Sequence, residues 1–298
     1  MKVLSEATDA RRFSRDMRRS GKTIGFVPTM GFLHEGHLSL IKLAREHADI
    51  VVASIYINPL QFSANEDFDE YPRDAEGDRQ KLEEAGCAMV FEPKSLYSGV
   101  SDASHVIGAA SEQTHQTIVQ VEQLEKPLCG QSRPHFFRGV ATVVAKLFNI
   151  MEPDVAVFGS KDYQQGKVIS RMTKDLDFPI KIVMGPIFRE QDGLAMSSRN
   201  ARLDPGVRSN TIALFQSLKW AKSEVKTRKA TSPDDLRKGI EEKIAASGGD
   251  IDYVEVVDAE TLDKVGQVGK EPLLIAVAVF FPAKDGDRVR LIDNIVIE

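Results

Sequence analysis

Two apolar runs rich in β-branched residues, at positions 23–27 and 50–57, lie on either side of a segment with helical periodicity. Each run has the length and composition of a buried strand in a parallel sheet. From Gly36 onward, residues such as Leu38 and Ile41 recur at the spacing of one helical face. A strand, a helix and a second strand in this order predict a βαβ unit. We therefore expect an α/β fold whose ligands lie at the carboxyl ends of its strands.

The turn between the first strand and the helix reads Pro28-Thr-Met-Gly-Phe-Leu-His-Glu-Gly-His37. Pro28 is expected to end the strand because it cannot donate to a sheet ladder. Gly31 and Gly36 allow a tight turn and a close approach of the backbone to a ligand. The N–H groups at the start of the helix favour phosphate. His34 and His37 are three residues apart, so they share a helical face and both can donate to phosphate oxygens.

The histidine pair has two other interpretations. Histidines on a first helical turn are often capping or surface residues. They are also candidates for two metal ligands, but no third Cys, His or acidic residue lies nearby at the spacing of a metal site. Because a strand, a proline, two glycines and two histidines coincide at one turn, the sequence favours a phosphate site.

Length, charge and apolar content limit which classes of protein this chain can belong to. The chain has 298 residues, a net charge of −5 and 42% hydrophobic residues. At roughly 150 residues per domain, it is long enough for about two domains. The negative charge argues against general nucleic-acid binding and is compatible with a local pocket for a small anion. Without a run of about 18 apolar residues or the apolar core of a signal peptide, we expect a cytoplasmic protein that does not contact membranes.

The cysteines and the next loops carry fewer signals. Cys87 and Cys129 are too few for a disulfide framework or a zinc site. Gln61, in the stretch Asn-Pro-Leu-Gln-Phe after the second strand, suits a hydroxylated carboxylic acid because an amide both donates and accepts; otherwise it is a solvated loop residue. In the loop at 127–139, Arg133 and Arg138 either contact an anion or are solvated surface charges.

A further predicted strand, residues 155–158, is followed by Gly159-Ser-Lys-Asp-Tyr-Gln-Gln. This order repeats the layout of the first site, because Lys161 can neutralise a phosphate where Gly159 permits close approach. Asp162 suits a ribose or adenine group, and Gln165 lies one helical turn beyond Lys161, where it is expected to face the same pocket. The alternatives are a helix-capping aspartate and surface glutamines.

The last polar motif runs from Phe188 to Arg199 and ends in Met-Ser-Ser-Arg. Its two hydroxyls and guanidinium can wrap phosphates, although it is otherwise a plain serine-rich loop. Beyond it the pattern predicts a smaller α/β domain, so we divide the chain into residues 1–187 and 188–298. The helices and strands expected there are at 204–225, 233–246, 253–257, 273–280 and 289–297.

Together these motifs resemble those of the pantothenate synthetase (pantoate–β-alanine ligase) family, within the HxGH nucleotidyltransferase superfamily. Pro-Thr-Met-Gly followed by His-Glu-Gly-His looks like its signature, and the stretches Asn-Pro-Leu-Gln-Phe, Tyr-Pro-Arg, Lys-Asp-Tyr-Gln-Gln and Met-Ser-Ser-Arg resemble its other motifs. The chain departs from the family at Ser160, where glutamate is usual, and at Phe188, where valine is usual. The resemblance covers essentially the whole chain. It implies a Rossmann-like doubly wound parallel sheet with a smaller C-terminal α/β lid domain.

The resemblance further implies ATP-dependent ligation of pantoate and β-alanine to pantothenate through a pantoyl adenylate, with AMP and pyrophosphate released, Mg²⁺ required and a homodimer formed. It assigns catalysis to His34, His37, Lys161 and Arg199. It assigns ATP binding to Met30, Gly31, His34, Gly36, His37, Gly159, Lys161, Asp162, Phe188, Met196, Ser197, Ser198 and Arg199. It assigns pantoate and β-alanine binding to Pro28, Thr29, Met30, Asn58, Gln61, Arg133 and Gln165, and leaves the metal ligands unknown.

Two other function classes fit the motifs. A plain adenylyltransferase would move AMP onto a phosphate or nucleotide acceptor and would not need the two glutamines. A non-catalytic nucleotide sensor would keep the fold and the phosphate loops, but this chain keeps all the reactive side chains as well. The products formed from ATP separate the three classes.

Overall fold

The computed structural model describes residues 1–62, 68, 70–97, 115–227, 232–269 and 271–298. The chain forms two compact units. The first consists of Met1–Glu125, Arg133–Ser160 and Gln165–Pro186. The second consists of Lys126–Ser132, Lys161–Gln164 and Ile187–Glu298. Two short segments that precede residue 187 in the chain therefore belong with the C-terminal residues.

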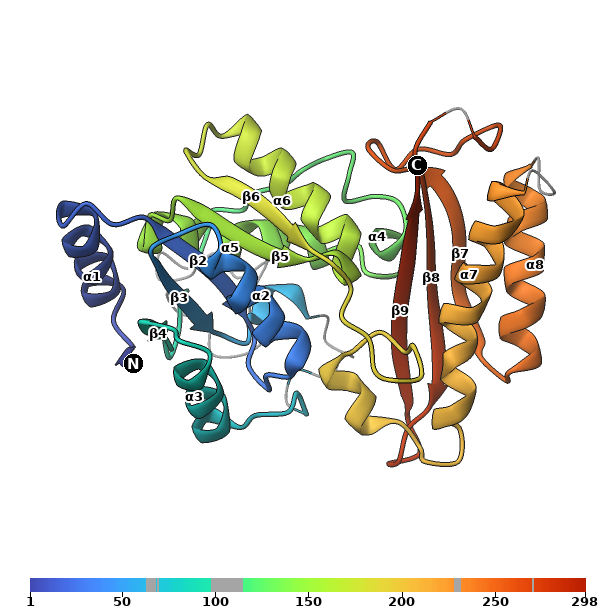
Figure 1. Cartoon of the computed structure of the whole chain (residues 1–298), viewed down its shortest axis with the longest axis horizontal. Helices are drawn as coiled ribbons and strands as arrows, with labels where there is room; N and C mark the ends of the chain where they lie inside the picture. The colour runs from blue at the N-terminus through green and yellow to red at the C-terminus, as the bar shows by residue number, and fades with distance from the viewer. Residues whose placement is uncertain (63–67, 69, 98–114, 228–231, 270) are drawn as a thin grey trace. The chain divides into compact units, whose positions relative to one another are not determined.

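The first unit is built on a six-stranded parallel sheet of order β1-β4-β3-β2-β5-β6 (Figure 1). The strands are β1 (Lys2–Leu4), β2 (Ile24–Thr29), β3 (Ile50–Ile55), β4 (Met89–Phe91), β5 (Val155–Gly159) and β6 (Lys181–Gly185). The helices around it are α1 (Ala7–Arg19), α2 (Glu35–Arg45), α3 (Ala75–Glu84), α5 (Phe136–Met151) and α6 (Tyr163–Asp175).

Both faces of this sheet are buried, as its apolar strands predict. On one face, Val27 and Val51 share a core with Ile41 of α2 and Leu82 of α3. Side chains alternate along a strand, so Phe26 points to the other face, where α1 and α5 pack together. Helices on both faces of a parallel sheet confirm the predicted doubly wound α/β fold.

The strand order reverses between β2 and β5. From β2 the chain passes to β3 and β4 on one side, and it then returns to place β5 and β6 on the other side. At such a reversal the loops that leave the two central strands diverge, which opens a crevice beyond their carboxyl ends. The turn at 28–37 leaves β2 there, and Gly159 closes β5.

Several predicted boundaries were wrong. β2 continues through Pro28 to Thr29, because it pairs with β5 only at Gly25 and Phe26, and the missing N–H of proline is tolerated where one neighbour is absent. The edge strand β1 was not predicted. The helix expected from 204 starts only at α7 (Ala213–Lys226), because the Pro-Gly pair at 205–206 forms a turn on Asp204 instead.

The second unit contains a three-stranded antiparallel sheet in the order β7-β8-β9. These strands are β7 (Asp250–Asp258), β8 (Leu273–Pro282) and β9 (Arg288–Ile297), and α7 packs on them beside α8 (Pro233–Ala246). Leu218 and Ile240 of the helices share one core with Val277 of the central strand. This confirms the predicted smaller α/β domain. Among the described helices, none combines the length and apolar composition that crossing a membrane requires.

Candidate active site

The turn after β2 has a left-handed backbone at two consecutive residues. Gly31 has φ +85° and Phe32 has φ +51°. A methyl group on Gly31 would lie 3.0 Å from an oxygen of Asp78 and 3.0 Å from Ile55, so both the backbone angle and the packing require glycine there. Thr29 Oγ1 accepts a hydrogen bond from the Gly31 N–H at 3.2 Å and donates one to the Ser54 carbonyl at 2.8 Å. The turn is therefore anchored to both β2 and β3.

A buried carboxylate holds the other side of this turn. Asp78 of α3 accepts the N–H groups of Phe32 at 2.7 Å and Leu33 at 2.6 Å. Lys81, one helical turn later, donates to the Leu33 carbonyl at 2.8 Å. Burial raises the pKa of Asp78, while the two N–H bonds oppose that shift. Asp78 was not predicted from the sequence. It lies four residues before the buried Leu82 and therefore on the apolar face of α3, where a carboxylate needs a polar partner, and this position was the available signal.

The two histidines lie together at the start of α2. His34 is the N-cap residue, and its ring centroid is 4.0 Å from that of His37. The His34 backbone N–H donates to His37 Nδ1 at 3.3 Å. Because Nδ1 accepts, we assign the proton of the neutral His37 ring to Nε2, which makes that nitrogen the donor for a ligand. The capping interpretation of this pair is thus compatible with phosphate binding.

The amide of Gln61 is buried beside Met30, in the 3-10 turn η1 (Pro59–Gln61). Its Nε2 lies 2.9 Å from Met30 Sδ, and Asn58 donates to its Oε1 at 3.1 Å. Arg133 donates to the Gln61 backbone carbonyl at 3.1 Å and stacks on Phe136 at 3.8 Å from the ring centroid. The structure therefore brings together four residues predicted to bind pantoate. The alternative of a solvated loop glutamine is wrong.

Gly159 ends β5 without any packing demand for glycine. The nearest atom to a methyl group placed there is Leu40 Cδ1 at 3.7 Å, an ordinary contact. Gln165 is half-buried in α6 of the first unit. Its neighbour Gln164 is fully engaged, since it accepts from the Cys129 N–H at 3.1 Å and donates to the Pro127 carbonyl at 2.6 Å. For Gln164, the surface alternative is wrong.

The remaining predicted ATP residues belong to the second unit. Lys161 Nζ lies 3.8 Å from Asp162 Oδ1, and Asn294 of β9 donates to the Lys161 carbonyl at 2.9 Å. Ser197 caps the 3-10 turn η4 (Ser198–Arg202), with its hydroxyl accepting the Arg199 N–H at 3.3 Å. The hydroxyl that is predicted to meet a phosphate therefore also shapes the loop.

A short hairpin, residues 188–196, presents the Met-Ser-Ser-Arg loop. Its two arms pair at Arg189 and Ala195, and Met196 donates to the Phe188 carbonyl at 2.9 Å. Arg189 makes a bidentate pair with Asp293 of β9 at 2.7 and 2.9 Å, with its guanidinium carbon 4.0 Å from the ring centroid of Phe215 in α7. One arginine thus fixes the hairpin to both the sheet and a helix of its own unit. The Phe188 side chain itself is exposed.

Two further observations concern ligands. Within the described part of the chain, no three His, Cys, Asp or Glu side chains are arranged to hold a metal ion. Among the predicted ATP residues, Asp162 supplies the one carboxylate, so a protein cage for Mg²⁺ does not fit, whereas an ion held mainly by the phosphates of a nucleotide does.

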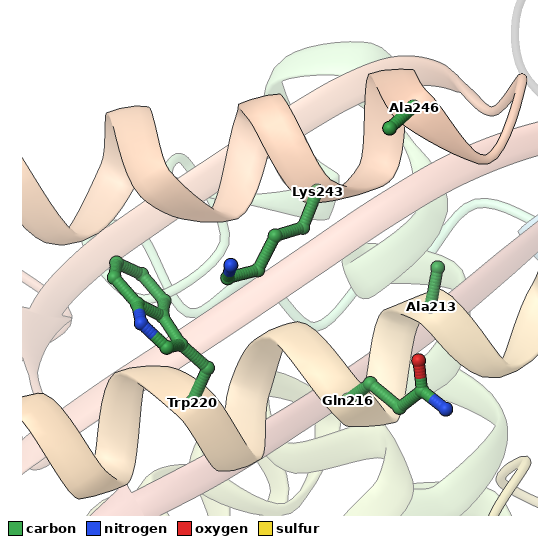
Figure 2. A pocket seen from close by; sticks show the side chains of 5 residues that line it. All are labelled: Ala213, Gln216, Trp220, Lys243 and Ala246. Atoms are coloured by element: carbon green, nitrogen blue, oxygen red, sulfur yellow. The ribbon is translucent and has the colours of Figure 1, made fainter.

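A small open pocket lies between α7 and α8 (Figure 2). Ala213, Gln216, Trp220, Lys243 and Ala246 line it, and Lys243 Nζ lies 4.7 Å from the ring centroid of Trp220. None of these was predicted as a site residue. With one lysine as its single ionisable group, the pocket has no acid and base pair, so we place no chemistry there.

Comparison with known proteins identifies the family. The family model described as pantoate-beta-alanine ligase matches residues 2–296. A pantoate–beta-alanine ligase of Lotus japonicus is 48% identical over 309 residues, with 99% of this chain and 98% of that protein covered. A pantothenate synthetase of Desulfatibacillum aliphaticivorans is 47% identical over 300 residues, and both chains are covered at 100%.

Solved structures agree with these matches. The pantothenate synthetase of Thermus thermophilus superposes with a TM-score of 0.85 at 39% identity, covering 99% of both chains. The pantoate–beta-alanine ligase of Francisella tularensis, solved with beta-gamma ATP and beta-alanine, gives a TM-score of 0.76 at 28% identity over 99% of this chain and 97% of that one. The chain therefore belongs to the pantoate–beta-alanine ligase family.

Proposed function

We propose that this enzyme joins pantoate to β-alanine through a pantoyl adenylate, with ATP cleaved to AMP and pyrophosphate. The proposal rests on one observation: two groups of hydrogen-bond donors follow the adjacent central strands β2 and β3. Imidazole N–H groups follow β2, and the buried amide of Gln61 follows β3. Phosphate oxygens suit the first set, and the carboxylate and hydroxyl oxygens of pantoate suit the second. The ATP and beta-alanine found with the Francisella ligase support the same substrates here.

In the first step, a pantoate carboxylate oxygen forms a bond to the α-phosphorus of ATP, and the bond from that phosphorus to pyrophosphate breaks. The carboxylate is already a nucleophile, so this step needs alignment and charge stabilisation rather than a general base. We assign alignment to Gln61 and Gln165. We assign charge stabilisation on the phosphates to His34, His37, Lys161, Ser197, Ser198 and Arg199.

The remaining predicted residues have supporting roles in this scheme. Pro28, Thr29 and Met30 line the pantoate side, with Asn58 and Arg133 supporting Gln61. Gly31, Gly36 and Gly159 let the backbone approach the nucleotide. Asp162, Phe188 and Met196 are assigned to its ribose and base.

In the second step, the amine of β-alanine attacks the acyl carbon of the adenylate, AMP leaves, and the amine loses a proton. The adenylate must be kept from water until then. A lid role for residues 188–298 stays a prediction, as do the homodimer and the cytoplasmic location. Mg²⁺, when bound, would neutralise phosphate charge, and the nucleotide would supply most of its ligands.

Product analysis tests the proposal. With ATP, pantoate and β-alanine, we expect equal amounts of AMP, pyrophosphate and an amide, and with β-alanine omitted at most one turnover of pyrophosphate per active site. Formation of an adenylylated acceptor without an amide would instead indicate a plain adenylyltransferase. Absence of pyrophosphate under every substrate combination would indicate a nucleotide sensor.

A further inference from the structure

A buried tyrosine that lies 39 residues further along the chain makes a hydrogen bond to Asn58, the residue that donates to the Gln61 amide. Tyr97 Oη donates to Asn58 Oδ1 at 2.9 Å, and the Leu60 backbone N–H donates to the same oxygen at 3.3 Å. Tyr97, Asn58 and Gln61 are all buried. None of the motifs in the sequence pointed to Tyr97.

The Asn58 amide has a single orientation that satisfies its neighbours. Its oxygen receives two donors, the Tyr97 hydroxyl and the Leu60 N–H. Its Nδ2 donates to Gln61 Oε1 at 3.1 Å and to the Gly139 carbonyl at 3.1 Å. A 180° rotation would set the amide nitrogen against the Leu60 N–H, which can only donate, and the oxygen against the Gly139 carbonyl, which can only accept. In a buried site such a mismatch is costly, so the orientation of Asn58 is fixed.

Close packing keeps this arrangement in place. Gly139, near the start of α5, approaches η1 so tightly that a methyl group on it would lie 2.2 Å from the Leu60 carbonyl oxygen. Burial raises the pKa of Tyr97, so its hydroxyl keeps its proton and remains a donor at neutral pH.

The fixed Asn58 amide in turn decides which end of Gln61 meets a ligand. Gln61 Oε1 is occupied by the Asn58 donor, so Nε2 is directed the other way, to within 2.9 Å of Met30 Sδ. A thioether is a weak acceptor. An incoming carboxylate or hydroxyl oxygen would therefore gain a stronger hydrogen bond from Nε2 than the one it replaces.

We propose that Tyr97 is a positioning residue that orients the Gln61 amide through Asn58, so that the pantoate subsite presents a hydrogen-bond donor and selects an oxygen acceptor. This inference rests on the proposed role of Gln61 in binding pantoate. It extends that role to a side chain that does not itself meet the substrate.

Tyr97→Phe removes only the hydroxyl and tests the proposal in the full-length enzyme. We expect the KM for pantoate to rise about tenfold, as loss of one well-placed hydrogen bond predicts, while the KM for ATP changes less than twofold. Tyr56→Phe is the matched control. Tyr56 is a second buried tyrosine, with its ring centroid 6.3 Å from that of Tyr97, but its hydroxyl accepts the Leu96 N–H instead of bonding Asn58. Its removal should leave the KM for pantoate unchanged.

A double-mutant cycle separates orientation from a merely structural effect. In the Gln61→Ala background, Tyr97→Phe should cause no further rise in the KM for pantoate, because there is no amide left to orient. Equal effects in both backgrounds, or equal changes in the ATP and pantoate KM values, would overturn the proposal.

One more variant and the Gln61→Ala enzyme on its own complete the test. Should Tyr97→Phe not fold, Asn58→Asp takes its place. The aspartate would put an oxygen opposite Gln61 Oε1, which should rotate the glutamine amide and raise the KM for pantoate at least as much. An unchanged KM for pantoate would overturn the proposal. If Gln61→Ala itself leaves the pantoate KM unchanged, the assignment of Gln61 in the proposed function fails, and the positioning role of Tyr97 fails with it. If Gln61→Ala raises that KM and Tyr97→Phe does not, only the positioning role fails.

Discussion

Two of the turns that carry or present predicted phosphate ligands are held by different kinds of bond. After β2, the left-handed backbone of Gly31 and Phe32 is held by uncharged N–H groups that meet one buried carboxylate, Asp78. The hairpin at 188–196 is held by guanidinium groups, with Arg189 on Asp293 and Arg208 on Glu190. The first turn depends on hydrogen bonds from backbone N–H groups to Asp78, and the second depends on ion pairs between side chains.

Burial decides how much each charge pair is worth. The side chain of Asp293 is 1% exposed and that of Arg189 is 19% exposed, whereas Arg208 and Glu190 are 27% and 30% exposed. A buried ion that loses its partner keeps its full desolvation cost, while an exposed ion is rehydrated and screened. The two arginines that hold this hairpin should therefore respond very differently to substitution.

The largest effect is expected for Asp293→Ala. It leaves the mostly buried Arg189 without its bidentate partner, and breaking a buried pair in this way costs about 3–5 kcal/mol. Hydrogen exchange of the β9 amides in the full-length protein measures this loss within the second unit. A decrease in protection worth less than about 1 kcal/mol would show that Arg189 finds water or another acceptor.

His37→Ala should be next in size. Loss of one preorganised donor to a developing anion commonly slows a reaction by roughly 10²-fold or more. Single-turnover formation of pantoyl adenylate is the measurement, and the thermal transition should move little because the His37 side chain is only half-buried. Near wild-type adenylate formation would mean that the histidine only caps α2.

Asp78→Ala should destabilise the first turn by about 1–3 kcal/mol, since it leaves buried N–H groups without an acceptor. Asp78→Asn is the matched variant, because it keeps one acceptor oxygen and the same shape and should lose less. Hydrogen exchange at the amides of Phe32 and Leu33 reports the change directly. Equal protection in the wild type and both variants would contradict the role given to this carboxylate.

The smallest effect is expected for Arg208→Ala, at most about 1 kcal/mol and weaker in high salt. Its hydrogen bond and charge lower the pKa of Asp192. A lowered pKa in the folded state stabilises the protein above the unfolded pKa of about 3.9, and that contribution is lost as the pH falls through the lowered value. The stability difference between wild type and variant should therefore shrink below about pH 4. A difference independent of pH and salt would rule out an electrostatic origin.

Local patterns made the central βαβ unit and the clustered histidines predictable. Strand composition, helical spacing and the glycines of one turn all lie within a few residues of one another. The partners of Asp78 and Tyr97 were not predictable, because Phe32 and Asn58 lie 46 and 39 residues away from them along the chain, and a single polar residue gives no sign of which distant segment it meets. The local pattern at Pro28 gave a wrong strand end. Whether a proline ends a strand depends on which neighbouring strands pair with it, and the local sequence does not show this.

In the proposed first step, the pantoate carboxylate itself attacks the α-phosphorus of ATP. Pantoate labelled with ¹⁸O in both carboxylate oxygens tests it in one reaction with ATP and β-alanine. Attack by the carboxylate predicts that one labelled oxygen leaves with each AMP and the other stays in the amide product. Label recovered in inorganic phosphate together with ADP, or AMP without label, would contradict attack of the carboxylate on the α-phosphorus.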